Sequence, residues 1–415
     1  MNLLYNSGIA AYAALARVAA MRSEKVKTML RGQAEASAKV DEARRRVAPQ
    51  GFDVWFHAAS LGEFEQARPL IEMLKERRPK LTVLLTFFSP SGYEVRKDYK
   101  FADCVAYLPF DRPAAVRRFL DAAQPRTAIF VKYEFWGNYM SQLKSRGIPV
   151  FLIDAIFRPG QIFFRSYGAT FRNILHCYTH IFVQDEASRQ LLASVGVTDV
   201  TVAGDTRFDR VTQVMNTRVN LPAIEEWLKD SPFTFIAGSS WQPDEECYIP
   251  WLNSHPEVRA IIAPHEFDAA RLDKLRKQLA APAVLWSDIV ASGKPIPRDT
   301  RTVIIDTFGL LSSLYRFGSV ALVGGGFGAG IHNINEAAVY GIPVLFAPNH
   351  RKFKEAADLI AAGGAFEYTD ANMLSAHLDR FLKSPPDLDA AGHRAGEYIK
   401  EHLGASELIY AHLGL

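Results

Sequence analysis

Four short segments of the chain combine residue types that could do chemistry. Two carry carboxylates beside small or aromatic residues and two are rich in glycine and serine; they are Ala59–Glu63 (ASLGE), Lys132–Trp136 (KYEFW), Gly238–Ser240 (GSS) and Gly324–Glu336 (GGGFGAGIHNINE). A carboxylate can accept a proton from an attacking hydroxyl group. Small residues before a helix expose backbone N–H groups that can bind a phosphate.

The first segment has two interpretations. Ser60 and Glu63 have the S-x-x-E spacing of a capping box, which closes a helix start without any catalysis, and the spacing alone favours this interpretation. In the alternative, Gly62 lets a substrate approach the backbone, while Glu63 faces the ligand and acts as a general base.

The second segment places Glu134 among aromatic residues, directly after a predicted strand over 127–131. An acidic residue with aromatic neighbours at the carboxyl end of a strand can hold a sugar by stacking and hydrogen bonds. An ordinary loop whose aromatic side chains complete the core has the same composition. Both interpretations stay open.

Glycine and serine distinguish the last two segments. Gly238–Ser240 is followed by Pro243 and by the acidic residues 244–246, which is typical of a helix start and is also compatible with phosphate binding. Residues 324–330 include five glycines in seven positions, more than a structural turn needs. A ligand is therefore favoured at the fourth segment.

The fourth segment also contains the pattern G-x-G-x-x-A, formed by Gly324, Gly326 and Ala329, which occurs in dinucleotide-binding proteins. Those proteins place an acidic residue at the end of the next strand, whereas the predicted strand over 343–346 runs into Ala-Pro-Asn-His. We find no P-loop and no H-E-x-x-H or other metal-ligand motif. The sequence therefore predicts a metal-independent reaction that needs no cofactor.

Short apolar runs precede these segments and alternate with longer amphipathic ones. Continuous apolar runs predict parallel strands that helices cover on both faces. The expected strands are 54–59, 81–86, 104–107, 127–131, 150–153, 180–183, 200–203, 233–237, 258–263, 283–285, 302–306, 320–324, 343–346 and 365–368. The pattern restarts near residues 220–222, which predicts an α/β fold of two Rossmann-like domains facing a cleft. A last helix over about 390–402, extended to 413, is expected to cross back to the first domain.

Composition limits the possible functions. Of the 415 residues, 48% are apolar and 22% are charged, which is typical of a globular protein. The formal net charge of +3 excludes a protein that coats nucleic acid along its length, and no nucleic-acid partner is expected. Cys104, Cys177 and Cys247 lie far apart and form no CxxC pair, which indicates a reducing compartment and no structural zinc.

The N-terminus is apolar and then basic. Residues 1–16 carry no charged side chain, and residues 1–50 contain nine Lys and Arg against four Asp and Glu. Nothing after the apolar run is typical of a secretory signal. The pattern predicts either a helix in or on an anionic cytoplasmic leaflet, or a helix packed on its own domain, and both remain open.

Taken in order, the motifs resemble those of the 3-deoxy-D-manno-oct-2-ulosonic acid (Kdo) transferases, from about Trp55 to Leu359. Their shared order is more specific than any one of them. The matches are Trp55–Glu63 (WFHAASLGE) to W-x-H-A-x-S-x-G-E, Glu134 with Trp136 to a second acidic motif, Gly204–Asp209 (GDTRFD) to G-N-x-K-x-D, Asp306–Gly309 (DTFG) to D-T-x-G, and Gly330–Glu336 (GIHNINE) to G-G-H-N-x-x-E. The family has the two-domain GT-B glycosyltransferase fold, in agreement with the double βα pattern.

The resemblance implies roles for individual residues. Glu63 would be the catalytic base, and Glu134 and Arg207 would stabilise the transition state. The residues expected to bind substrate, chiefly the CMP portion of the donor, are Gly238, Ser239, Ser240, Pro264, His265, Asp306, Thr307, Phe308, Gly309, Gly325, Gly326, Ile331, His332, Asn333, Asn335 and Glu336. The sequence departs from the family at several positions. Arg207 stands where the family usually has Lys, His265 where it has Arg, Asp205 where it has Asn, Ile331 where it has Gly and Ala337 where it has Pro. Residues 154–165 also differ from the usual N-A-R-x-S.

The reaction implied is transfer of Kdo from CMP-Kdo to a lipid A precursor, lipid IVA, in lipopolysaccharide biosynthesis at the cytoplasmic side of the inner membrane. Residues 1–48 would associate with the membrane, 49–215 would bind the acceptor, and 216–415 would bind the CMP-sugar. Two alternatives are another GT-B enzyme that uses a UDP-sugar, such as an epimerase, and a membrane-peripheral scaffold that binds no nucleotide.

Overall fold

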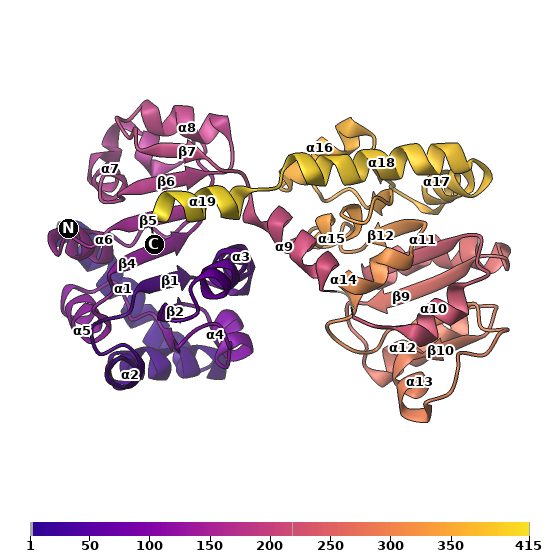
Figure 1. The fold of residues 1–415 in the computed structure, drawn as a ribbon, viewed down its shortest axis with the longest axis horizontal. Helices are drawn as coiled ribbons and strands as arrows, with labels where there is room; N and C mark the ends of the chain where they lie inside the picture. The colour runs from indigo at the N-terminus through magenta and orange to yellow at the C-terminus, as the bar shows by residue number, and fades with distance from the viewer. Residues whose placement is uncertain (1–2, 218, 415) are drawn as a thin grey trace. The chain divides into compact units, whose positions relative to one another are not determined.

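The computed structural model describes residues 3–217 and 219–414 and divides into two compact units. Unit 1 comprises residues 1–210 with 404–415, and unit 2 comprises residues 211–403. Each unit is a seven-stranded sheet covered by helices (Figure 1), as the alternating pattern predicts. The predicted ranges 1–48 and 216–415 include residues 1, 2, 218 and 415, which lie outside the described residues.

The sheet of unit 1 has the strand order β3-β2-β1-β4-β5-β6-β7, and every neighbouring pair is parallel. Its strands are β1 (Val54–Ala58), β2 (Val83–Phe87), β3 (Cys104–Tyr107), β4 (Thr127–Val131), β5 (Val150–Ala155), β6 (His180–Val183) and β7 (Val200–Val202). Its helices are α1 (Leu3–Ala20), α2 (Glu24–Val47), α3 (Leu61–Arg77), α4 (Pro90–Arg96), α5 (Pro113–Ala123), α6 (Gly137–Ser145), α7 (Ala169–Leu175), α8 (Glu186–Ala193) and α19 (Ala405–Leu413). Branched and aromatic side chains form these strands because they fit a sheet that is buried on both faces.

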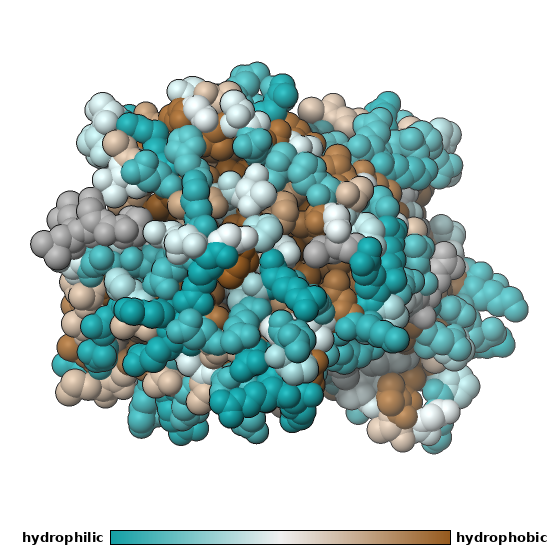
Figure 2. Space-filling view, turned by 60° about the vertical axis from the view of Figure 1, so that its left-hand side comes forward, coloured by the Kyte–Doolittle hydropathy of each residue, from teal (hydrophilic) through white to brown (hydrophobic). Residues whose placement is uncertain are grey.

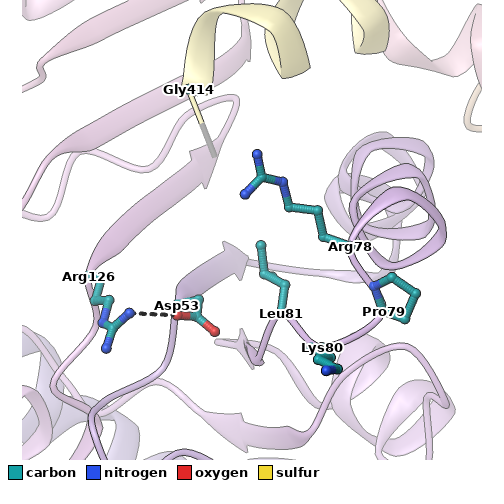
Figure 3. Close-up of a pocket in the computed structure, with 7 residues that line it drawn as sticks. All are labelled: Asp53, Arg78, Pro79, Lys80, Leu81, Arg126 and Gly414. Carbon is teal, nitrogen blue, oxygen red and sulfur yellow. Dashed lines mark hydrogen bonds and ion pairs between the residues drawn. The ribbon is translucent and has the colours of Figure 1, made fainter.

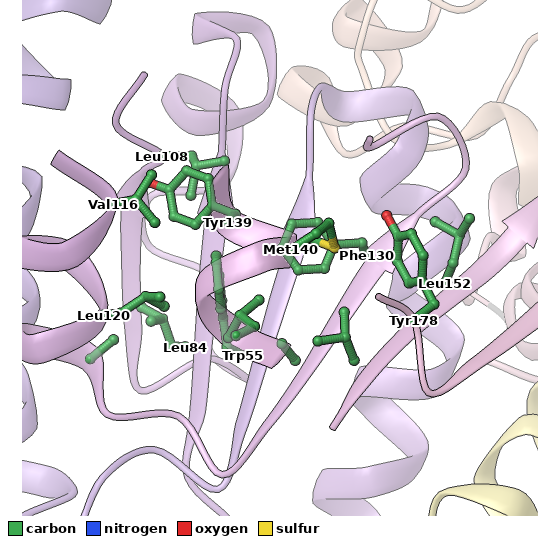
Figure 4. Close-up of a cluster of buried hydrophobic side chains, with 14 of the residues drawn as sticks. Trp55, Leu84, Leu108, Val116, Leu120, Phe130, Tyr139, Met140, Leu152 and Tyr178 are labelled. Atoms are coloured by element: carbon green, nitrogen blue, oxygen red, sulfur yellow. The ribbon is translucent and has the colours of Figure 1, made fainter. Parts of the chain in front are cut away.

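One face of this sheet packs around Trp55 of β1 (Figure 4). The rings of Phe119, Phe130 and Tyr139 lie with centroids 5.1 to 5.7 Å from that of Trp55. The indole Nε1 donates to Thr86 Oγ1 at 2.8 Å, so the polar atom of this buried side chain is satisfied. This cluster fixes β1 and β4 side by side, and both strands lead into predicted site segments.

The sheet of unit 2 has the order β10-β11-β9-β8-β12-β13-β14 and is also parallel throughout. Its strands are β8 (Thr234–Ser240), β9 (Arg259–Pro264), β10 (Ala283–Leu285), β11 (Thr302–Ile304), β12 (Val320–Val323), β13 (Val344–Phe346) and β14 (Ala365–Glu367). Its helices are α10 (Pro222–Leu228), α11 (Gln242–Ser254), α12 (Ala269–Gln278), α13 (Trp286–Ser292), α14 (Leu311–Leu314), α15 (Asn335–Ala338), α16 (Lys354–Ala362), α17 (Ala371–Lys383) and α18 (Pro385–Glu401), while α9 (Thr206–Asn216) begins in unit 1 and ends in unit 2.

Two strands extend further than the apolar pattern predicts. β5 continues to Ala155, which pairs with β6, and β8 continues beyond its predicted end at residue 237 to Ser240, which pairs with Pro264 of β9. Each extension contains a residue in the left-handed region, Asp154 at φ +55° and Ser239 at φ +51°. The predicted end of this strand at residue 237 is therefore wrong, because the neighbouring strand still offers backbone partners to residues 238–240.

The C-terminal segment is two helices rather than one. Gly404, at φ +101°, separates α18 from α19. Ile409 and Leu413 of α19 are buried in the apolar cluster on the second face of the unit 1 sheet, and Arg77 of α3 pairs with Glu407 at 2.6 Å. The end of the chain thus completes unit 1.

Helix α1 is anchored at its start and exposed further along. The Tyr5 hydroxyl donates to Asp111 at 2.6 Å, and the Asn138 amide donates to Asn6 at 2.9 Å. The apolar side chains of Tyr12, Leu15 and Val18, in the later turns of the helix, are exposed, and so is Met21, which follows the helix. On the face shown in Figure 2 hydrophilic residues predominate, with apolar patches scattered between them. No helix within residues 3–217 and 219–414 is long and apolar enough to cross a bilayer.

Candidate active site

The strand order reverses direction between β1 and β4 in the unit 1 sheet, and between β8 and β12 near the middle of the unit 2 sheet. Ligands of parallel sheets bind beyond the carboxyl ends of the strands at this switch point, because the loops diverge there and leave a crevice. The segments singled out from the sequence stand at these four strand ends: 59–63 after β1, 132–136 after β4, 238–240 in β8 and 324–336 after β12. The topology therefore gives each unit one candidate site.

Glu63 lies in the first turn of α3 and is held by a side chain. The Ser60 hydroxyl donates to Glu63 Oε2, and although Ser60 is the N-cap residue, its side chain accepts no helix N–H. The capping box that the spacing favours is therefore wrong, because the hydroxyl serves the carboxylate instead. Gly62 is exposed, and a Cβ there would meet no atom closer than Ser60 Oγ at 3.7 Å. A ligand can therefore approach the backbone beside the Glu63 carboxylate.

Glu134 is almost fully buried, and its carboxylate has a fixed orientation. The wholly buried His57 of β1 places Nε2 3.0 Å from Glu134 Oε2, and the Trp136 indole also donates to this oxygen. A carboxylate only accepts, so His57 carries a proton on Nε2. His57 Nδ1 lies 3.0 Å from Thr86 Oγ1, which holds the ring from its other side. The Glu134 carboxylate is thereby preorganised at the switch point.

A second group of ionisable residues lies at the same edge of unit 1, and we call it the Arg207 centre: Lys132, Asp154, Asp205 and Arg207. Arg207 binds Asp205 through two nitrogens, with Nε 2.9 Å and Nη2 2.6 Å from Asp205 Oδ2. The two departures from the family at 205 and 207 thus form one ion pair. Asp205 is buried, which raises its pKa, but the charge and hydrogen bonds of Arg207 outweigh burial and hold that pKa below its ordinary value.

Asp154 behaves in the opposite way. Its side chain is buried at the end of β5, where Oδ1 accepts the Thr206 backbone N–H at 2.8 Å and Oδ2 lies 2.8 Å from Thr206 Oγ1. Burial, reinforced by the negative charge of Asp205, raises the pKa of Asp154 to about 8. The pKa values of these two neighbouring carboxyl groups are therefore shifted in opposite directions.

The site of unit 2 is a cavity of about 420 Å³ at the end of β12. It is lined by Trp241, Pro243, Asp244, His265, Gly325, Phe327, Gly328, Ala329, Gly330 and His332. Gly325 has φ +96°, and a Cβ on the next residue, Gly326, would lie 2.4 Å from the Ala347 carbonyl oxygen. Glycine is required at both positions, so the loop presents backbone rather than side chains to a ligand.

Asp244 ties this loop to the start of α11. Its Oδ2 accepts the backbone N–H groups of Trp241 at 2.9 Å and Gly325 at 3.1 Å, and its Oδ1 accepts the Tyr368 hydroxyl at 2.9 Å. The acidic run after Pro243 therefore does more than cap a helix. It fixes the wall of the cavity.

Aromatic rings form another wall. Trp241 stacks on His265 with centroids 4.4 Å apart, and His265 lies 4.6 Å from His332. Burial and the neighbouring His265 lower the pKa of His332, which keeps its imidazole neutral at pH 7. Stacked rings beside exposed backbone suit a ligand with a planar base and an anionic group.

Some residues predicted to bind substrate have structural partners. The Asp306 carboxylate accepts the Ser287 backbone N–H at 2.9 Å and also its hydroxyl, which holds the start of α13. Glu336 accepts hydrogen bonds from Ser312 and Asn333. Their roles toward a ligand stay predictions.

Of the remaining predicted residues, His265, Gly325 and His332 line the unit 2 cavity. The others differ in exposure: Gly238, Ser240, Pro264, Gly326, Ile331 and Asn335 are buried, Ser239 is half-buried, and Thr307, Phe308 and Gly309 are exposed. The Phe308 ring packs on Phe267 with centroids 4.6 Å apart.

A larger cavity of about 650 Å³ lies at the opposite, amino edge of the unit 1 sheet (Figure 3). Asp53 pairs there with Arg126 at 3.2 Å and accepts the Thr82 N–H at 2.8 Å. Because ligands of parallel sheets bind at the carboxyl edge, this cavity is not the candidate site. Over the described ranges, 3–217 and 219–414, no group of three or more His, Cys, Asp or Glu side chains is placed to hold a metal ion.

Comparisons with known proteins agree with the motif order. Residues 21–210 match the family model described as 3-deoxy-D-manno-octulosonic-acid transferase (kdotransferase). The chain is 30% identical over 381 residues to the 3-deoxy-D-manno-octulosonic acid transferase of Bordetella pertussis, with 87% of each chain covered. The chain belongs to this transferase family. The transferase of Haemophilus influenzae is 27% identical over 378 residues, covering 87% of this chain and 86% of that one.

Solved structures bear on the fold of the transferase. The UDP-GlcNAc 2-epimerase of Neisseria meningitidis, solved with UDP-GlcNAc bound, matches with a TM-score of 0.60 at 16% identity, covering 87% of this chain and 99% of that one. A likeness at this identity shows the fold alone. The expected GT-B fold of two Rossmann-like domains is confirmed, and so is the family.

Sequence reasoning did not assign three side chains of the transferase that shape its sites: His57, Trp241 and Asp244. His57 offered a signal, because a polar ring inside a continuous apolar strand needs a buried partner. Asp244 and Trp241 gave none beyond helix-start spacing, since their partners Tyr368, Gly325 and His332 are distant in sequence.

Proposed function

We propose that the transferase moves Kdo from CMP-Kdo to a hydroxyl group of a lipid A precursor, lipid IVA, in lipopolysaccharide biosynthesis. Glu63 carries this proposal, because it is a half-buried carboxylate beside an exposed glycine at the switch point of unit 1. Family membership supports Kdo as the transferred sugar. The glycine-rich, aromatic cavity of unit 2 supports a nucleotide as the donor's carrier.

Glu63 acts as the general base in a single inverting displacement. A sugar hydroxyl is a poor nucleophile at neutral pH, so the carboxylate accepts its proton as the oxygen attacks the anomeric carbon of Kdo. The bond between that carbon and the phosphate oxygen breaks, and CMP leaves with the electron pair. Ser60 keeps the accepting carboxylate in position through its hydroxyl.

The transition state carries charge at two places. The sugar ring becomes positive, and the Glu134 carboxylate, fixed by His57, stabilises it without having to reorient. The departing phosphate becomes negative, and a positive charge such as the Arg207 guanidinium stabilises it. The glycine loop of unit 2 offers backbone N–H groups to the nucleotide. This arrangement needs no metal ion.

The transferase works at the cytoplasmic face of the inner membrane in this proposal. The exposed apolar side chains Tyr12, Leu15 and Val18 of α1 suit a helix that lies in the membrane interface. The basic residues that follow, at 22, 25, 27 and 31, attract anionic headgroups. A membrane-lying helix would bring the lipid acceptor to unit 1.

One assay tests the reaction. The transferase is incubated with CMP-Kdo and lipid IVA, and mass spectrometry measures the product. A mass increase equal to whole Kdo residues is the expected result, and unchanged lipid contradicts the proposal. In parallel, CMP is expected to raise the melting temperature and UDP to leave it unchanged, because a ligand stabilises the folded state that binds it; stabilisation by UDP instead would favour a UDP-sugar enzyme.

A further inference from the structure

We propose that Asp154 is a neutral, protonated carboxylic acid in the working transferase, and that it acts as a positioning residue which adds no negative charge beside Arg207 at neutral pH. The protonation follows from hydrogen-bond geometry within unit 1. The consequence for transfer rests on the proposed role of Arg207, so the two parts need separate tests.

The geometry around Thr206 locates the proton. Thr206 Oγ1 lies 2.6 Å from the Gln66 carbonyl oxygen and 2.8 Å from Asp154 Oδ2. A carbonyl oxygen only accepts, and a hydroxyl has one proton, which Thr206 must donate to Gln66 because two bare acceptors at 2.6 Å would repel. The proton in the second short contact therefore comes from Asp154 Oδ2.

The other oxygen of Asp154 fits this assignment. Asp154 Oδ1 accepts the Thr206 backbone N–H at 2.8 Å, so it carries no proton. The carboxylic acid thus donates one hydrogen bond to Thr206 and accepts another from it. An Asn side chain would make the same two hydrogen bonds, with its amide nitrogen as donor and its amide oxygen as acceptor. Asp154 also adopts φ +55°, a left-handed conformation that Asp and Asn tolerate better than other non-glycine residues.

The neighbouring carboxyl group is ionised, in contrast. Asp205 accepts from Arg207 at 2.6 Å and 2.9 Å, which is the geometry of an ion pair. Asp205, which precedes α9, and Thr206 and Arg207, which begin it, all face Asp154. The Gln66 carbonyl oxygen of α3 faces the Thr206 hydroxyl. The charge of Lys132, after β4, acts on Asp205. One carboxyl of the pair holds a proton because the other does not.

The charge of the centre depends on that proton. The positive charges of Arg207 and Lys132 both act on the ionised carboxylate of Asp205. Ionisation of Asp154 would add a second negative charge beside Arg207. The substrates of the proposed reaction carry phosphate and carboxylate groups, and the affinity for either oxyanion falls when a negative charge is added close to it.

Infrared spectroscopy tests the proton without any activity. The native transferase at pH 6.5 is expected to show the carbonyl stretch of a protonated carboxylic acid, which is lost on raising the pH above 9 and is absent from Asp154→Asn. Asp98→Asn, at an exposed position of the same unit, is the matched control and keeps the band. A difference spectrum between native protein and Asp154→Asn without this band overturns the proposal.

Thermal unfolding gives a second readout. Asp154 is neutral when folded and loses its proton on unfolding above pH 4, so the stability of the native protein relative to Asp154→Asn falls as the pH rises from about 4 to about 8 and is then level. The melting temperature of Asp154→Asn is expected to exceed that of the native protein by a margin that widens over this range. A constant margin contradicts a buried proton.

The pH profile of transfer tests the positioning role. In the native transferase the KM for the substrate whose oxyanion meets this centre is expected to rise about tenfold between pH 7 and pH 9.5, and Asp154→Asn is expected to abolish this rise. An identical alkaline rise in both proteins overturns the role. Absence of transfer at every pH in both proteins would refute the proposed function, whereas infrared and melting data would still decide the proton.

Discussion

The two units share a way of building a sheet but prepare their switch points differently. In unit 1 the groups are charged side chains, each fixed by another side chain: Glu63 by Ser60 and Glu134 by His57. In unit 2 the wall is glycine backbone that Asp244 ties in place. The first arrangement is sensitive to charge and the second to volume. A substitution that keeps the shape of a side chain but removes its charge is therefore expected to impair the unit 1 site most. An added methyl group is expected to impair the unit 2 site most.

The largest effect is expected from Glu63→Gln, which keeps the shape of unit 1 and removes its base. Transfer is expected to fall about 10³-fold, measured as initial rate with CMP-Kdo and lipid IVA, because the amide cannot accept the proton. The melting-temperature increase caused by CMP is expected to persist, since unit 2 is unchanged. Glu76→Gln, at an exposed position of the same helix, is the control, and full activity in both variants would rule out Glu63 as the base.

Gly326→Ala tests whether the glycine loop of unit 2 has room for an added methyl group. The new Cβ would lie 2.4 Å from the Ala347 carbonyl oxygen, so the loop must shift, at a cost of about 1–3 kcal/mol in the free energy of unfolding. Stabilisation by CMP is expected to be lost. In Gly328→Ala the nearest atom is the Gly325 carbonyl oxygen at 3.6 Å, so this variant is expected to keep CMP binding. Equal behaviour of the two variants would show that close packing of the loop is irrelevant.

A smaller loss is expected when Glu134 loses its fixed orientation. His57→Ala removes a buried donor to the carboxylate, which is expected to lower kcat roughly 10- to 100-fold. His57→Gln, which can keep an N–H donor, is expected to retain more activity. Stabilisation by CMP serves as the check that unit 2 is intact, and a change in CMP affinity larger than the change in kcat would contradict the separation of the two sites.

The smallest effect concerns pH and the docking of α19 on unit 1. Burial and the nearby His412 lower the pKa of His180, whose ring centroid lies 4.0 Å from that of His412. His180 is therefore neutral when folded, and stability is lost as the pH falls through the ordinary histidine value of about 6.5. His412→Phe is expected to reduce the drop in melting temperature between pH 7.5 and 5.5 by roughly 1–2 °C. The exposed His393→Gln in unit 2 is expected to leave this drop unchanged.

The sequence predicted the architecture well because a parallel sheet buried on both faces produces continuous apolar runs. Each expected strand overlaps an observed one, and the restart near residue 220 reflects a second sheet. The ends of strands were less predictable. β5 and β8 continue into polar residues because a neighbouring strand supplies hydrogen bonds there, and a polar side chain such as Asp154 gives no local sign of that neighbour.

The candidate sites were predictable as segments but not as contacts. Motif order located Glu63, Glu134 and the glycine loop, whereas spacing favoured a cap at Ser60 that the structure does not form. A hydroxyl three residues from a carboxylate can serve the helix backbone or the carboxylate, and only the folded geometry decides between them. The partners of Asp244 and Glu134 come from other strands and loops, so no local pattern could reveal them.

The return of α19 to unit 1 has a consequence for how the protein is made. A ribosome delivers residues 211–403 before residues 404–415, so unit 2 emerges whole while unit 1 still lacks its final helix. The apolar surface that Ile409 and Leu413 cover stays open to water until residues 404–415 have been synthesised. The half of the protein that is synthesised first is thus the last to be finished.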